Sequence, residues 1–136
     1  MPSKIYTYPV LIKEGHLDAY GHVNDAVYME LFEEARWDFI TKNGYGFKQV
    51  METGLGPVSL EATLRYQREL QLREEIVIES CMTSYTKKIG KLSQKMRRGK
   101  DVCCSAEFTL ALFNLKERKL VLPTPARLQG VGRENP

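Results

Sequence analysis

One long helical pattern dominates the first third of the chain, from Ala26 to about Lys42. At about 100° per residue, its apolar side chains gather on one stripe, formed by Tyr28, Leu31, Phe32, Ala35 and Phe39. Met29 and Ile40 widen the stripe until it covers nearly half of the helix surface. The segment "NGYG", Asn43–Gly46, then supplies a stop signal. A helix with so broad an apolar face has to be wrapped by a concave surface.

The segments around this helix alternate between apolar and polar residues, as strands do. In "VSLEATLRYQRELQL", residues 58–72, every even position except Arg68 is apolar, which predicts a long half-buried strand. Further strands are predicted for residues 4–13, 74–85, 88–98 and 101–115. Gly99–Lys100 forms the hairpin turn between the last two. Because the connections are short, the pairing should be antiparallel. The predicted fold class is therefore α+β, with a curved sheet of about five strands around one long helix.

Length and composition describe an ordinary soluble domain. The 136 residues fit one domain, residues 1–136, in which the Gly-rich tail from about residue 126 should be frayed. Hydrophobic residues make up 43% and charged residues 27%, as in globular proteins with a real core. The N-terminus lacks the apolar run of a signal peptide, and no stretch approaches the ~20 apolar residues of a membrane span. We therefore expect a cytoplasmic protein.

The cysteines and the net charge do not indicate a disulfide-stabilised, metal-binding or nucleic-acid-binding protein. Cys81, Cys103 and Cys104 are odd in number and lack C-x-x-C spacing, so we expect buried thiols, without disulfides and without a metal site. A net charge of +3 is too small to indicate nucleic-acid binding by itself.

The loop "HLDAYGHVND", His16–Asp25, holds both histidines of the chain directly before the helix. The first turn of a helix has backbone amides without intrahelical partners, and these amides can hold a developing oxyanion. Gly21 permits close approach of a substrate carbonyl to the amides between Val23 and Ala26. The carboxylate of Asp18 lies just upstream and can act as a nucleophile or a base. One carboxylate and one oxyanion site suit a thioester better than an amide, because a thiolate leaves readily.

The loop also has an ordinary interpretation. A glycine with Asp and Asn nearby is common wherever a loop enters a helix. On this interpretation Asn24 only caps the helix, and Asp18 only ends a turn.

The order of elements resembles the hotdog fold over nearly the whole chain. The run "LDAYGHVNDAVYMELFEEAR" resembles the signature of acyl-CoA thioesterases of the 4-hydroxybenzoyl-CoA thioesterase type, which includes the YbgC-like proteins. Their motif is an Asp, two variable residues, Gly-His-Val-Asn, and a Tyr four residues after the Asn. The matching positions here are Asp18, Gly21, His22, Val23, Asn24 and Tyr28.

This resemblance implies a role for each position. Asp18 becomes the catalytic carboxylate, and the amides at about Val23 and Asn24 polarise the thioester carbonyl. His22 either orients substrate or water or only shapes the loop, and Tyr28 either packs in the core or lines the substrate pocket. No metal and no separate cofactor are implied, since coenzyme A is part of the substrate. The chain departs from many relatives at His16, where they carry a second Asp, and at Asp25, where the Asn is often doubled.

The basic run "KKIGKLSQKMRRGK", residues 87–100, has two interpretations. Lysines protect a sheet edge from aggregation, or they form a rim for the phosphates of coenzyme A. "KIGKLS" resembles the family's strand along the pantetheine tunnel, which suggests that Lys91 and Ser93 bind substrate. Nucleic acid is disfavoured because no reading motif accompanies the charges. The resemblance also implies a homo-oligomer, either a dimer or a tetramer, with active sites between subunits.

The predicted function is hydrolysis of an acyl-CoA thioester to the free acid and CoA. An acyl-carrier-protein thioester as substrate and a non-catalytic acyl-thioester binder remain as alternatives. A hotdog dehydratase is disfavoured, because its His is followed shortly by Phe-Pro-Gly whereas His22 is followed by "VNDA".

Overall fold

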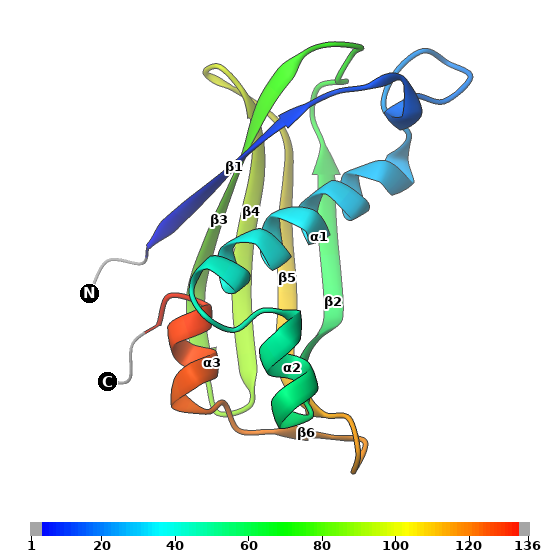
Figure 1. Ribbon diagram of the computed structural model, residues 1–136. Helices are drawn as coiled ribbons and strands as arrows, with labels where there is room; N and C mark the ends of the chain where they lie inside the picture. Colours follow the sequence, from blue (N-terminus) through cyan, green and yellow to red (C-terminus); the bar gives the residue numbers. More distant parts are fainter. Residues whose placement is uncertain (1–3, 134–136) are drawn as a thin grey trace.

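The computed structural model describes residues 4–133 and has an α+β architecture (Figure 1). The strands are β1 (Ile5–Leu11), β2 (Leu55–Tyr66), β3 (Glu75–Thr86), β4 (Ile89–Arg98), β5 (Asp101–Asn114) and β6 (Lys119–Val121). The helices are α1 (Asp25–Lys42), α2 (Phe47–Thr53) and α3 (Pro125–Gly130), with a 3-10 turn η1 at Glu14–His16. None of the helices within residues 4–133 has the length and apolarity needed to cross a bilayer.

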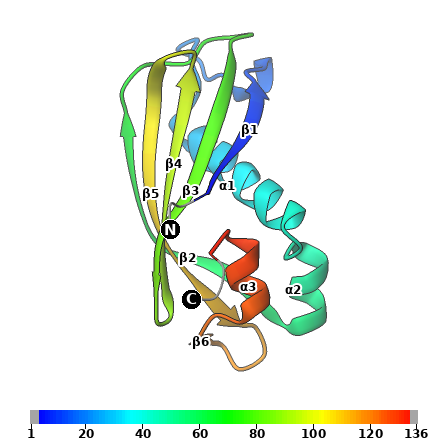
Figure 2. The same cartoon turned by 90° about the vertical axis from the view of Figure 1, so that its left-hand side faces the viewer.

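The sheet is antiparallel, with strand order β1-β3-β4-β5-β2 and with β6 paired to the end of β5. It has six strands, one more than predicted, because the three-residue β6 is too short to show an alternating pattern. Figure 2 shows all three helices on the same side of the sheet, so the other face is not covered by a helix.

The predicted apolar stripe of α1 forms the core against the sheet. Tyr28, Leu31, Phe32, Ala35, Phe39 and Ile40 are all buried. Phe32 meets Phe108 of β5 edge to face, with ring centroids 5.9 Å apart. Only Met29 departs from the prediction, since its side chain is 38% exposed.

A buried amide links α1 to the middle of the sheet. Gln94 of β4 is fully buried and donates through Nε2 to the carbonyl of Phe32, at 3.1 Å, and to Oγ of Ser80, at 2.9 Å. Its Oε1 accepts from Nη1 of Arg36 at 3.1 Å. All the polar atoms of this amide are therefore satisfied inside the core, which fixes the position of α1 over β3 and β4.

The predicted strand at residues 58–72 was wrong in its extent and burial. β2 ends at Tyr66, has a bulge between Ser59 and Glu61, and pairs only with β5. Because it is an edge strand, several side chains of the predicted buried face stay exposed, among them Leu60 at 48% and Tyr66 at 50%.

The C-terminal region was predicted to be frayed, and that prediction was wrong as far as residue 133. α3 begins after Thr124, whose hydroxyl oxygen accepts from the amide of Arg127 at 3.2 Å. Nδ2 of Asn43 donates to the carbonyl of Gly130 at 3.0 Å, and Val131 is buried. The segment is therefore held by long-range contacts that local composition does not reveal. The rest of the predicted tail, residues 134–136, lies outside the described residues.

Candidate functional site

The loop before α1 is a tight turn that presents Asp18. Leu17 and Val23 form an isolated antiparallel bridge. Within it, the amide of Asp18 donates to the carbonyl of His22, and the amide of Gly21 donates to the carbonyl of Asp18, both at 3.1 Å. Gly21 has φ 86°, a left-handed conformation that glycine adopts without strain. The turn thus depends on the glycine of the predicted motif.

Only one oxygen of the Asp18 carboxylate is hydrogen-bonded in the described structure. Its Oδ1 accepts from the amide of Tyr20 at 2.8 Å, which orients the side chain. Within the described part of the chain, its other oxygen has no hydrogen-bond partner, and the residue is only partly buried. One oxygen is therefore held in place, and the other is left unpaired among the described residues.

The free amides at the start of α1 lie within the predicted range from Val23 to Ala26, but directly after the pair that the resemblance implied. The amide of Val23 donates to the carbonyl of Leu70 and that of Asn24 to the carbonyl of His16, both at 3.1 Å, so the prediction that these two are free was wrong. The amide of Val27 already turns back to the carbonyl of Asn24 at 2.9 Å. At the start of α1, the amides of Asp25 and Ala26 are therefore left without a backbone acceptor among the described residues.

Asn24 occupies the N-cap position of α1, as predicted, but its side chain makes no capping hydrogen bond. The ordinary interpretation of this residue as a side-chain cap is therefore not supported. Its backbone carbonyl, rather than its amide side chain, receives the first turn.

The two histidines have local partners. Nδ1 of His22 lies 3.2 Å from the carbonyl oxygen of Val23, and the ring stacks on Tyr20 with centroids 6.0 Å apart. Nδ1 of His16 accepts from the amide of Lys13 at 2.9 Å. Neither ring hydrogen-bonds to the carboxylate of Asp18 in the described structure, so that carboxylate is not part of a His–Asp pair.

Tyr28 is buried and belongs to the core. Its ring meets that of Tyr66 edge to face at 5.0 Å, and the hydroxyl of Tyr66 donates to the carbonyl of Asp25 at 3.3 Å. Burial raises the pKa of Tyr28 to about 12, so this phenol stays protonated at neutral pH. The two tyrosines fasten the start of α1 to the end of β2.

Lys91 and Ser93 lie on the sheet face opposite to α1. Gln94 on the same strand points to the helix, and successive side chains alternate between faces. Nζ of Lys91 donates to Oγ1 of Thr109 at 2.8 Å, and both residues line a pocket of about 220 Å³. A single chain therefore does not join these two residues to the Asp18 loop, and their contact with substrate stays a prediction.

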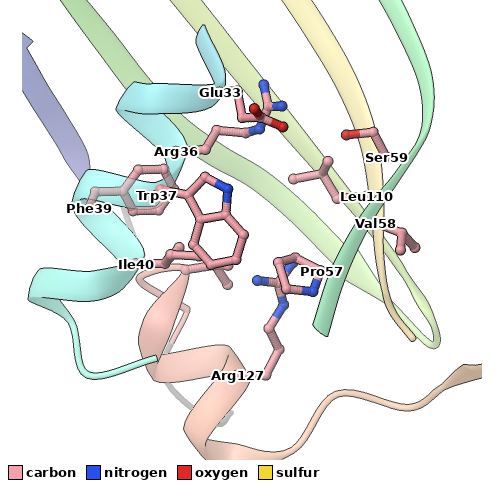
Figure 3. A pocket seen from close by; sticks show the side chains of 11 residues that line it. Glu33, Arg36, Trp37, Phe39, Ile40, Pro57, Val58, Ser59, Leu110 and Arg127 are labelled. Atoms are coloured by element: carbon pink, nitrogen blue, oxygen red, sulfur yellow. The ribbon is translucent and has the colours of Figure 1, made fainter. Parts of the chain in front are cut away.

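A second pocket, which the sequence did not indicate, lies between α1, β2 and α3. Figure 3 shows Arg36 and Trp37 of α1, Pro57 of β2 and Arg127 of α3 around it, and its volume is about 240 Å³. Arg127 lies in the segment that was expected to be frayed, so no local signal distinguished it from the other arginines.

The cysteines of the chain are largely buried, and its described acidic residues do not form a metal-binding group. Cys103 and Cys104 are buried, as predicted, and Cys81 is partly buried. Burial raises the pKa of the Cys104 thiol to about 12, so it is not a nucleophile at neutral pH. Within residues 4–133, no three His, Cys, Asp or Glu side chains gather into a group that could hold a metal ion.

The chain matches known thioesterases in sequence and in fold. Residues 12–130 match the model of the thioesterase-like superfamily. The chain is 31% identical over 112 residues to the long-chain acyl-CoA thioesterase FadM of Escherichia coli (strain K12), covering 81% of this chain and 84% of FadM.

Two solved structures illustrate the similarity in fold. The probable thioesterase YbaW of Escherichia coli superposes with a TM-score of 0.82 at 26% identity, covering 93% of this chain and 98% of YbaW. SAV2348 of Staphylococcus aureus, solved in complex with CoA, superposes with a TM-score of 0.88 at 16% identity, covering 100% of this chain and 90% of SAV2348.

Proposed function

The chain belongs to the thioesterase-like superfamily and is a thioester hydrolase, and we propose that it hydrolyses acyl-CoA thioesters with Asp18 as the catalytic carboxylate. The similarity to FadM, a long-chain acyl-CoA thioesterase, supports the substrate class. The observation that carries the proposal is the loop before α1. It holds one free carboxylate oxygen on Asp18 and ends at the two unpaired amides of Asp25 and Ala26.

In this mechanism the thioester carbonyl oxygen is bound by the amides of Asp25 and Ala26. These donors lie at the positive end of the α1 dipole, where negative charge is stabilised. The free oxygen of Asp18 attacks the carbonyl carbon, or takes a proton from the water that attacks it. The oxyanion then collapses, the C–S bond breaks, and CoA leaves as a thiolate that takes up a proton. When Asp18 itself attacks, water hydrolyses the resulting anhydride and restores the carboxylate.

We further propose that the enzyme is a homodimer in which two β2 strands pair. The edge strand β2 is long and has half-exposed apolar side chains, such as Leu60 and Tyr66. The unpaired backbone groups of such an edge can pair with a strand of another chain. Antiparallel pairing about a twofold axis brings the Tyr66 end of one copy against the Leu55 end of the other. The active-site loop, which Tyr66 fastens to β2, would then lie at the subunit boundary.

The decisive test is steady-state release of CoA thiol by the Asp18→Asn variant. General base or nucleophilic roles contribute about 10²–10⁴-fold, so we expect kcat to fall by about that factor. Asp101→Asn removes a carboxylate from an exposed residue at the start of β5 and serves as the matched control, with activity unchanged.

Two outcomes would contradict the proposal. Full activity of a folded Asp18→Asn variant would remove this carboxylate from the reaction. Stoichiometric binding of acyl-CoA by the original protein, without repeated thiol release, would identify a binding protein instead of an enzyme.

A further inference from the structure

The pocket between α1, β2 and α3 combines apolar walls with two arginines. Trp37, Ile40 and Leu110 are among its apolar lining residues. Arg36 and Arg127 approach it from opposite ends (Figure 3). Its volume of about 240 Å³ is slightly below the ~300–1,000 Å³ of pockets that hold a whole small ligand. It therefore fits one part of a ligand and is too small for a complete acyl-CoA.

Arg127 has an unusual environment for a charged side chain. The residue is 1% exposed, and its Nε and Nη2 are buried without a hydrogen-bond partner. Arg36, by contrast, donates to Gln94 and lies 4.3 Å above the ring of Phe108. A buried guanidinium without an acceptor is costly, and proteins rarely keep one unless an anion pairs with it.

The described residues of the chain do not supply this anion. Within residues 4–133, no carboxylate forms an ion pair with Arg127. Glu33 is the one acidic residue in the lining, and it is exposed at the end near Arg36. Figure 3 shows the side chain of Arg127 rising from α3 into the middle of the lining residues.

We propose that this pocket binds a carboxylate carried on an apolar body, and that Arg127 pairs with the carboxylate. The planar guanidinium presents donors in a fork that matches the two oxygens of a carboxylate. The apolar walls accept the hydrocarbon next to it. The site is separate from the Asp18 loop, which makes no contribution to its lining.

The carboxylate has two possible sources. It can be the far end of the acyl group of a thioester, which rests on the proposed function. Along α1, the 11 helical steps from Asp25 to Arg36 span about 16 Å, a distance that suits a long acyl chain. Alternatively it is a free carboxylic acid, such as the product of hydrolysis.

The first experiment measures binding without catalysis. Trp37 is the single tryptophan of the chain and lines the pocket, so its fluorescence reports occupancy. The full chain is titrated with octanoate and, as the uncharged comparison, with octan-1-ol. We expect a saturable change with octanoate, and weaker binding of the alcohol.

Three variants separate recognition from folding. Arg127→Gln should weaken octanoate binding by about tenfold or more, as expected for loss of a charge-assisted pair. Arg127→Lys retains the charge without the fork and should bind with intermediate affinity. Lys116→Gln removes one positive charge from the surface and should bind as the original protein does. Thermal melting of each variant checks that it is folded.

The second experiment distinguishes the two sources. Thiol release is compared for hexanoyl-, decanoyl- and hexadecanoyl-CoA and their ω-carboxylated counterparts. A higher kcat/KM for the carboxylated member of a pair, lost in Arg127→Gln, identifies the acyl group as the source. Octanoate binding without this preference identifies a free acid.

The proposal is overturned if octanoate causes no saturable fluorescence change, or if a folded Arg127→Gln variant binds it equally well. Either result stands independently of turnover. A protein that binds octanoate through Arg127 but never releases thiol would instead contradict the proposed function alone.

Discussion

Replacement of Arg127 by Met should stabilise the free protein. Met keeps most of the apolar stem and removes the guanidinium, whose Nε and Nη2 lack partners in a side chain that is 1% exposed. Unfolding returns the guanidinium to water, so its desolvation destabilises the folded state only. Removing the charge should therefore raise the free energy of unfolding, whereas most substitutions of buried residues lower it.

The size of the effect follows from the pocket. Replacing buried ionic groups by apolar residues of similar volume stabilises proteins by about 1–4 kcal/mol. The adjoining pocket of about 240 Å³ is large enough to admit water, which offsets part of the desolvation cost. We therefore expect a gain of about 1–2 kcal/mol in the lower part of this range. For a chain of this length, that corresponds to a rise in Tm of about 3–10 °C.

The assay is thermal unfolding followed by circular dichroism, at one protomer concentration because a dimer unfolds in a concentration-dependent way. Adding octanoate should reduce the difference in Tm between the two proteins, since it binds and stabilises the original protein and not the Met variant. A Tm several degrees lower in Arg127→Met would refute the reasoning, because it would mean that the guanidinium already has an acceptor in the free protein.

Three further predictions test the other features. Leu60→Lys on β2 should shift the protein from dimer to monomer in analytical ultracentrifugation. Leu122→Lys, at an exposed site outside β2, should leave the dimer intact. A Leu60→Lys variant that is still a dimer would exclude β2 as the interface. Gln94→Leu should lower the free energy of unfolding in urea by about 2–3 kcal/mol, because it leaves the buried partners of the amide unsatisfied. Gln67→Leu on the surface should leave the free energy of unfolding almost unchanged. Equal losses in the two variants would contradict the role of the buried amide. The thiol of Cys104, whose pKa burial raises to about 12, should resist iodoacetamide at pH 8 until the protein unfolds, as mapped by mass spectrometry; rapid labelling would contradict its burial.

Much of the fold could be predicted from the sequence because periodicity reports which side chains share a face. The stripe on residues 26–42 identified the buried side of α1, and the hairpin at Gly99–Lys100 follows from a glycine at φ 62°. The same rule misled at β2, since alternation cannot tell a strand in the middle of a sheet from one at its edge. Only the position of β2 in the sheet, where it has one main neighbouring strand, explains the exposure of Leu60.

The sequence by itself determined the order of elements, the apolar face of the helix and the loop that carries Asp18, since each is a property of neighbouring residues. The tertiary structure alone decided which amides remain free, because Leu70 and His16 take the donors of Val23 and Asn24 across separations that no local pattern records. It also buried Arg127, since α3 is held by contacts with residues more than eighty positions earlier in the chain. Faces are set by the local repeat of the backbone, whereas partners are set by which distant segments come together.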